Sequence, residues 1–147
     1  MPFQGQWADV LLAAERAHVL KLAVWAGCSV LAGTALYTWV RVQRGESALI
    51  RHFALQCAGW GALLLVMALW LRHRLALRDL ASAVALDRAT WFAIGLETGC
   101  VAVGLTLVLV GWRAGQRLGL VGAGLGLVVQ GLALAVLDLQ FAATVIR

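Results

Sequence analysis

Two carboxylic acids lie inside long apolar stretches of this sequence, where ionisable side chains are rare. Glu97 lies in the stretch from 90 to 110, and Asp138 lies in the stretch from 118 to 146. A charged side chain at the centre of a membrane-spanning helix costs about 2.5–3.5 kcal/mol, so each acid needs a partner or a wet cavity. Lys21 lies near the start of an earlier apolar stretch and is an available cation. We expect Lys21, Glu97 and Asp138 to form one polar cluster inside the membrane.

This cluster admits two interpretations. In the first, ion pairs and hydrogen bonds among the three side chains fasten the helices that carry them, and the role is purely structural. In the second, a desolvated carboxyl carries a proton or binds the polar head of a ligand. The residue types are compatible with both, so the sequence leaves the choice open.

Other polar side chains in the apolar stretches indicate helix packing rather than catalysis. Gln56 and Gln130 are expected to hydrogen-bond across two helices. A haem is disfavoured, because His18 and His73 lie at the ends of apolar stretches and no histidine lies opposite another in mid-span. No metal-ligand motif, nucleophile elbow, phosphate-binding loop or dinucleotide glycine pattern occurs in the right context. We therefore predict no metal and no bound cofactor, with haem and quinone as the alternatives.

The overall composition is that of a membrane protein. Of the 147 residues, 63% are hydrophobic and 13% are charged, and the mean hydropathy is +0.89. Since about 20 apolar residues cross a bilayer core, the chain has room for four spans and short loops but not for a soluble catalytic domain. The net charge of +5 comes from basic residues that border the apolar stretches and contact lipid headgroups. Nucleic-acid binding is therefore not expected.

The apolar stretches predict an all-α fold, a four-transmembrane-helix bundle that forms a single integral membrane domain over residues 1–147. The expected spans are 20–40, 50–71, 90–110 and 118–146. The segment 7–19 mixes charged residues with apolar residues at 7, 10, 11 and 14, which share one helical face. This segment is expected to be a short N-terminal interfacial helix, either separate from the first span or continuous with it.

Glycine is concentrated in the second half of the sequence, where ten of the sixteen glycines lie between Gly95 and Gly131. Small residues spaced four apart let membrane helices approach closely. We expect the last two spans to pack through such glycines, against each other or against a partner helix. The glycines concerned are Gly95, Gly99, Gly115, Gly119, Gly122 and Gly126.

The two halves of the sequence are weakly similar to each other. A shift of 72 residues superposes Gly27-Cys28 on Gly99-Cys100, Thr34 on Thr106, Arg41 on Arg113 and Gly59 on Gly131. This match indicates a duplicated helical hairpin. A duplication of this kind would relate the two halves by an axis along the membrane normal.

Four spans place both termini on one side of the membrane. Seven basic residues border the terminal side, namely Arg16, Lys21, Arg72, Arg74, Arg78, Arg88 and Arg147. Five border the opposite side, namely Arg41, Arg44, Arg51, Arg113 and Arg117. Because basic residues are enriched in cytoplasmic loops, this difference favours cytoplasmic termini.

Several short motifs resemble those of an uncharacterised family of small bacterial four-helix membrane proteins. They are Ala58-Gly59-Trp60, Gly95-Leu96-Glu97-Thr98-Gly99, Arg117-Leu118-Gly119-Leu120-Val121-Gly122, Gln130-Gly131 and Leu137-Asp138-Leu139. The resemblance covers roughly residues 22–145. In that family the third helix reads Gly-Leu-Asp-x-Gly-Tyr, whereas this chain has Glu97 for the Asp and Cys100 for the Tyr. The resemblance implies a four-helix fold and a location in the bacterial inner (cytoplasmic) membrane, and it implies no activity.

Because the loops are short and no catalytic motif is present, we expect a non-enzymatic protein. The leading hypothesis is an accessory or assembly subunit of a larger membrane complex, which contacts membrane lipid and other integral membrane proteins, or a copy of itself, through its glycine-rich helices. The alternative is a small carrier or proton-coupled protein that binds a lipid or a quinone at Glu97 and Asp138.

Overall fold

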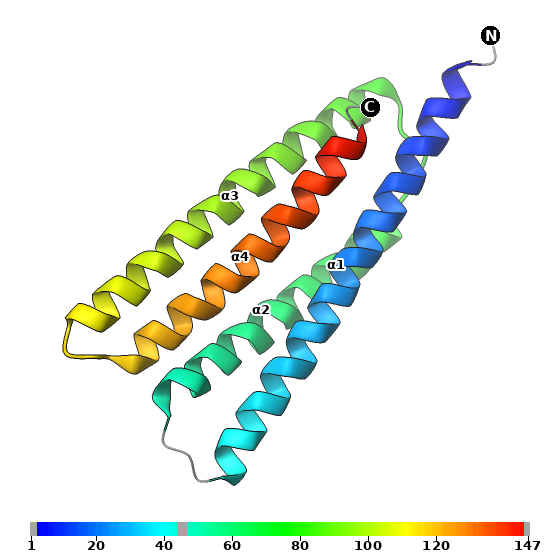
Figure 1. Ribbon diagram of the computed structural model, residues 1–147. Helices are drawn as coiled ribbons and strands as arrows, with labels where there is room; N and C mark the ends of the chain where they lie inside the picture. Colours follow the sequence, from blue (N-terminus) through cyan, green and yellow to red (C-terminus); the bar gives the residue numbers. More distant parts are fainter. Residues whose placement is uncertain (1–2, 44–46, 146–147) are drawn as a thin grey trace.

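The computed structural model describes residues 3–43 and 47–145, and these residues form four α-helices and no β-strand (Figure 1). The helices are α1 (Phe3–Val42), α2 (Ala48–His73), α3 (Leu80–Arg113) and α4 (Leu118–Val145). All four are long enough and apolar enough to cross a membrane. The predicted all-α, four-helix class is therefore confirmed. Arg44, Ile146 and Arg147, which the sequence analysis used, lie outside the described residues.

The expected interfacial helix over 7–19 is not a separate element, because it forms the first part of α1. This helix has 40 residues, which makes it about 60 Å long, roughly twice the hydrocarbon thickness of a bilayer. The buried side of this part of α1 also differs from the apolar face predicted from residues 7, 10, 11 and 14. Leu11 is buried, whereas Trp7 and Val10 are exposed. Leu22, further along the same helix, belongs to the buried core. A continuous helix keeps one phase, so the core residues determine which side of the N-terminal part faces inward.

Helix α3 also begins earlier than expected, at Leu80 instead of near residue 90. Asp79 caps this N-terminus, because its side chain accepts a hydrogen bond from the backbone N–H of Ser82 at 2.9 Å. Caps of this kind satisfy backbone donors that have no partner within the helix. The connection between α2 and α3 is consequently short, and the start of α3 extends the bundle at this end.

The helices form two antiparallel hairpins, α1–α2 and α3–α4, which lie beside each other (Figure 1). Helix α4 is central, because it packs against α1, α2 and α3. Among the described helices, α3 packs against α4 alone. Helix α1 begins and α4 ends at the same end of the bundle, which we call the terminal end (Figure 1). The two hairpins are not packed alike, since Gly131 contacts the backbone of Glu97 whereas its expected counterpart Gly59 faces open space.

Glycine brings the backbone of α4 close to both of its main neighbours. A Cβ atom added to Gly104 of α3 would lie 2.8 Å from the carbonyl oxygen of Gly124 on α4. A Cβ atom added to Gly124 would lie 2.5 Å from the carbonyl oxygen of Gly104. On the other side of α4, the backbone of Leu49 in α2 occupies the space where a side chain of Gly122 would lie. Small residues therefore permit the close helix contacts. This is expected in a membrane, where the hydrophobic effect does not drive helices together.

Some of the glycines expected to pack make no such contact. Gly95 and Gly99 are exposed on α3, with no atom within 4 Å of an added Cβ. Gly115 lies in the turn between α3 and α4 with a φ angle of +78°, a conformation that glycine adopts at little cost. Gly119 lies against the imidazole ring of His52. Spacing alone thus identified glycine-rich helices without identifying which glycines face a neighbour.

The two glutamines were expected to hydrogen-bond across the second and fourth spans, and the structure gives them other contacts. Gln130, which is 2% exposed, accepts a hydrogen bond from Trp25 Nε1 at 2.9 Å and donates one to Ser29 Oγ at 3.1 Å. Both partners belong to α1, so Gln130 fastens α4 to α1. Gln56 instead packs its Cβ and Cγ atoms against Gly126.

The variant Gly122→Ala is expected to destabilise the protein by about 1–3 kcal/mol, because the added methyl group overlaps the Leu49 backbone and α2 must shift. Thermal unfolding of the purified protein in detergent measures this effect. Gly99→Ala is the matched control, since it makes the same change in open space and alanine favours a helix. Equal melting temperatures for the two variants would contradict the close contact between α2 and α4.

Candidate functional site

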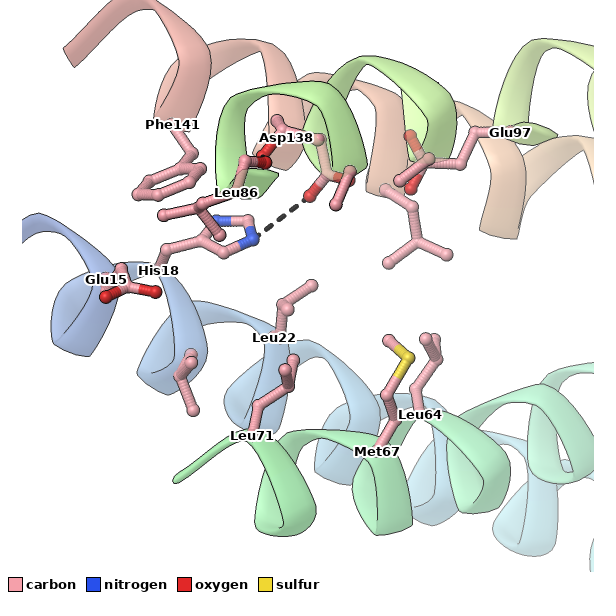
Figure 2. A pocket seen from close by; sticks show the side chains of 15 residues that line it. Glu15, His18, Leu22, Leu64, Met67, Leu71, Leu86, Glu97, Asp138 and Phe141 are labelled. Atoms are coloured by element: carbon pink, nitrogen blue, oxygen red, sulfur yellow. Dashed lines mark hydrogen bonds and ion pairs between the residues drawn. The ribbon is translucent and has the colours of Figure 1, made fainter. Parts of the chain in front are cut away.

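A cavity of about 270 Å³ lies among the four helices near the terminal end of the bundle (Figure 2). Its polar lining comes from α1, α3 and α4 and consists of Glu15, His18, Thr90, Glu97 and Asp138. Its apolar wall from α2 consists of Leu64, Met67 and Leu71. The cavity therefore combines groups that form hydrogen bonds with a surface that excludes water.

Asp138 pairs with a histidine from the opposite hairpin. Nε2 of His18 lies 3.1 Å from Oδ1 of Asp138. The ring of Phe141 stacks on the imidazole at a centroid distance of 4.6 Å (Figure 2). The side chains of His18 and Asp138 are only 13% and 9% exposed, and electrostatic attraction is stronger where water is excluded. This contact joins α1 to α4 at the wall of the cavity.

Lys21 does not join the two carboxylic acids as predicted. Its Nζ donates a hydrogen bond to Oε1 of Gln140 at 3.3 Å, and the side chain is exposed. The reason is helical phase. Leu22 is buried in the core, and successive helical residues point about 100° apart, so Lys21 turns away from the cavity.

Glu97 and Asp138 bring carboxyl groups from neighbouring helices into the same cavity, near enough to interact. Within the described part of the chain, Oε2 of Glu97 and Nδ1 of His18 are buried and make no hydrogen bond. A buried polar atom without a partner is costly. A proton shared with Asp138, or a donor group on a bound molecule, would satisfy Glu97.

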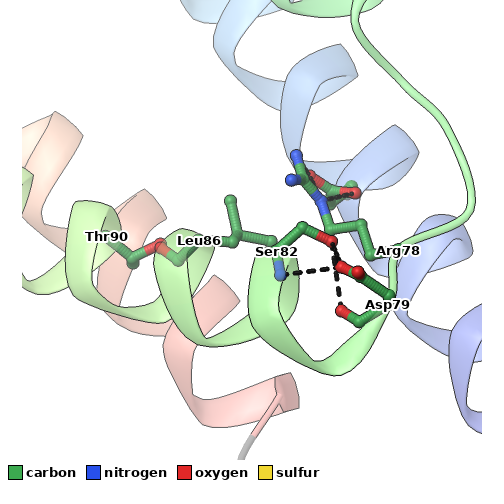
Figure 3. A network of polar contacts seen from close by, with 6 residues as sticks. Arg78, Asp79, Ser82, Leu86 and Thr90 are labelled. Atoms are coloured by element: carbon green, nitrogen blue, oxygen red, sulfur yellow. Dashed lines mark hydrogen bonds and ion pairs between the residues drawn. The ribbon is translucent and has the colours of Figure 1, made fainter.

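A second ion pair holds the α2–α3 connection against α1 (Figure 3). Nε of Arg78 donates to both carboxylate oxygens of Glu15, at 3.0 and 2.9 Å, and Nη2 donates to Oε1 at 2.7 Å. The hydrogen-bonded Glu15 carboxylate raises the pKa of the Arg78 guanidinium. Hydrogen bonds from the neighbouring Ser82 lower the pKa of the Asp79 carboxyl. These contacts fix the start of α3, and Glu15 becomes a neutralised part of the cavity lining.

An apolar groove of about 170 Å³ continues from the cavity between α2 and α3. The cavity and the groove share Leu64, Met67, Ala93, Glu97 and Leu134. The residues that line the groove but not the cavity include Trp60, Leu63, Leu96, Cys100 and Leu127. Because α2 and α3 do not pack against each other, the groove opens between them, on a side that lipid covers in a membrane. Glu97 lies where the polar cavity and the apolar groove meet.

Sequence reasoning missed part of this site. It gave no role to Glu15 or Phe141, and it considered His18 only as a haem ligand. A signal for α1 was present, because Glu15, His18 and Leu22 are spaced three and four residues apart and therefore share one helical face. No local signal indicated Arg78, because its partner is 63 residues away in the sequence.

The arrangement suits binding of a small molecule more than metal chemistry. Within residues 3–43 and 47–145, no group of three His, Cys, Asp or Glu side chains is placed to hold a metal ion. Carboxyl and imidazole groups accept hydrogen bonds and exchange protons. A molecule with a polar head and an apolar body would match both the cavity and the groove.

Comparisons with known proteins address the fold and leave the chemistry open. No curated protein and no solved structure matches the chain. Residues 21–139 match a family that is described only as one of unknown function. The matched region includes Glu97 and Asp138, and it begins after Glu15 and His18. The family resemblance noted from the sequence is thus confirmed, and the chain belongs to the DUF6992 family of unknown function.

Proposed function

We propose that this protein binds an amphipathic membrane molecule, a lipid or a quinone in its reduced quinol form. The polar head of that molecule lies in the cavity, and its apolar tail lies in the groove between α2 and α3. The observation that carries this proposal is the position of Glu97, at the junction of the two spaces. Of the two interpretations of Glu97 and Asp138, this one assigns them a ligand.

A purely structural role explains Glu97 less well. A side chain that only fastens helices has its hydrogen bonds satisfied, whereas Oε2 of Glu97 has no such partner in the described part of the chain. His18 already joins α1 to Asp138 of α4, and Gly131 of α4 lies against the backbone of α3 at Glu97. The helices are therefore linked at this point without the side chain of Glu97.

The charges of the site favour a head that donates hydrogen bonds. Arg78 neutralises Glu15, and Asp138 is paired with His18, which leaves Glu97 as an acceptor with no ion-pair partner among the described residues. A hydroxyl group of a quinol or the ammonium group of an aminolipid supplies such a donor, whereas a phosphate does not. Because carboxyl and imidazole groups exchange protons, the site has the means to couple binding to proton transfer.

The variant Glu97→Gln is expected to weaken ligand binding by about tenfold, since the amide replaces an acceptor oxygen with a donor, and a buried donor of the ligand left without a partner costs roughly 1–3 kcal/mol. Isothermal titration of the purified protein in detergent, with a short-chain quinol in one series and phosphatidylethanolamine in the other, measures this effect. The series that gives binding identifies the head.

Two further variants separate loss of binding from loss of folding. Met67→Trp fills the space shared by the cavity and the groove, so it is expected to abolish binding. Asp87→Asn is the matched control, because it removes a carboxylate from the same helix outside the cavity lining. The proposal fails if Glu97→Gln and Met67→Trp bind as the unaltered protein does, or if neither ligand binds the unaltered protein.

We also propose that the protein lies in the cytoplasmic membrane of a bacterium with both termini in the cytoplasm. Its four apolar helices and the excess of basic residues on the terminal side, seven against five, support this orientation. Alkaline phosphatase fused to the C-terminus, which works only outside the cytoplasm, should be inactive. An active fusion would show that the C-terminus lies outside the cytoplasm and would contradict the proposed orientation.

The exposed glycines of α3 favour a second candidate function, that of an accessory or assembly subunit of a membrane complex. Gly95 and Gly99 are four residues apart and face open space. This spacing lets the backbone of another membrane helix approach closely. In this role, α3 would bind a helix of another integral membrane protein.

Gentle extraction of the protein with its surrounding lipid tests the subunit candidate. We expect other polypeptides to co-isolate in fixed amounts, and the double variant Gly95→Leu, Gly99→Leu to lose them because its side chains fill the approach surface. Gly27→Leu is the matched control, since Gly27 on α1 also faces open space. A particle that contains only this chain and lipid would contradict the role of a complex subunit, and it would not affect the ligand proposal.

A further inference from the structure

Lys21 has no part in the cavity, but it lies at the end of a separate groove. An apolar groove of about 750 Å³ runs between α1 and α4 on the side of these helices that faces away from the cavity. Leu20, Val24, Trp25, Leu132 and Val136 are among its walls. Lys21 lies at the terminal end of this groove.

A small pocket adjoins the groove at Lys21. It measures about 70 Å³, and Lys21, Gln140 and Thr144 line it together with His18 and Phe141, which also line the cavity. The groove and the pocket share Lys21, so an apolar groove and a pocket with polar side chains meet at one ammonium group. The Lys21 ammonium donates to Gln140, which uses one of its three donors and leaves two for another molecule.

This surface has a basic character at its polar end. Arg16 is exposed and lies four residues before Leu20, which places it on the same face of α1. No carboxylate lines either the groove or the pocket. The cavity on the other side of the two helices has the opposite character, because Glu15, Glu97 and Asp138 all line it.

The apolar part of the surface is exposed. Leu20, Val24 and Val136 are 65%, 58% and 53% exposed. In a membrane such side chains contact acyl chains, and basic residues near the helix ends contact anionic headgroups. The shape, the apolar walls and the charge at one end therefore match a single kind of occupant.

We propose that the seam between α1 and α4 binds one anionic phospholipid. Its acyl chain lies in the groove, and its phosphate is bound by Lys21, with Gln140 beside it and Arg16 nearby. The groove shares no lining residue with the cavity of the proposed function, whereas the pocket shares His18 and Phe141 with it. The site requires an anionic head where the cavity favours a hydrogen-bond donor. Phosphatidylglycerol is the simplest lipid with the required charge.

Competition between two lipids tests this site. The full-length protein is reconstituted in vesicles of equal parts phosphatidylglycerol and phosphatidylcholine, extracted with its bound lipid, and analysed by native mass spectrometry. We expect phosphatidylglycerol to be retained preferentially. Lys21→Gln should reduce this preference about fivefold, the contribution expected for one basic residue near an anionic surface. Lys21→Arg should retain the preference.

Two more variants make the test specific to the groove. Arg88→Gln removes an exposed cation of α3 at the same end of the bundle and should leave the preference unchanged. Val136→Trp fills the groove without altering charge and should reduce the amount of lipid retained. The proposal is overturned if Lys21→Gln keeps the full preference, if Arg88→Gln loses as much, or if Val136→Trp retains lipid as before. Retention of a second polypeptide on this face in place of lipid would also overturn it.

Discussion

The close backbone contact between α3 and α4 determines the shape of the rest of the bundle. Gly104 and Gly124 let these two helices approach until the carbonyl oxygen of each lies where the other's side chain would be. Helix α3 is held by α4 alone among the described helices, so its opposite side is free of helix contacts. The cavity and the groove between α2 and α3 follow from this arrangement, because four helices packed equally against one another would fill that space with side chains.

A second constraint is that polar groups among apolar helices need partners within the chain. Gln130 satisfies it through Trp25 and Ser29, and Glu15 satisfies it through Arg78. Glu97 and His18 are the exceptions, since Oε2 of Glu97 and Nδ1 of His18 are buried without a hydrogen bond in the described part of the chain. Because burial of an unpaired polar atom is unfavourable, these two atoms are the strongest reason to regard the cavity as a binding site.

The fold was largely predictable from sequence, and the site only in part. Helix number and class follow from hydropathy, since about 20 apolar residues are needed for each span. The segment 7–19 is continuous with α1, which is one of the two alternatives that the sequence left open. The start of α3 was placed too late, because Asp87 and Arg88 interrupt the apolar pattern just before residue 90.

The error over Lys21 has a different cause, which is the loss of phase information in a membrane helix. A soluble helix shows its buried side as an apolar stripe, whereas α1 is apolar on both its buried and its lipid-facing sides. Leu20 is 65% exposed and Leu22 is 4% exposed, so hydropathy does not reveal which way Lys21 points. Glu97 and Asp138 do lie in one cavity, because their positions along the apolar stretches place them at a similar depth in the membrane, and this depth can be estimated from hydropathy without knowledge of helical phase.

The seam between α1 and α4 differs from the other helix contacts in its chemistry. Glycine and backbone contacts join α4 to α3 and α2, whereas hydrogen bonds and an ion pair link α1 to α4. His18 with Asp138 lies on the cavity side, and Lys21 with Gln140 lies on the groove side. A ligand can replace one hydrogen-bond partner by another at little net cost, but it cannot replace a backbone contact. Ligands on either side therefore act on the one seam of the bundle that is held by exchangeable contacts, which makes α1 the helix best placed to respond to them.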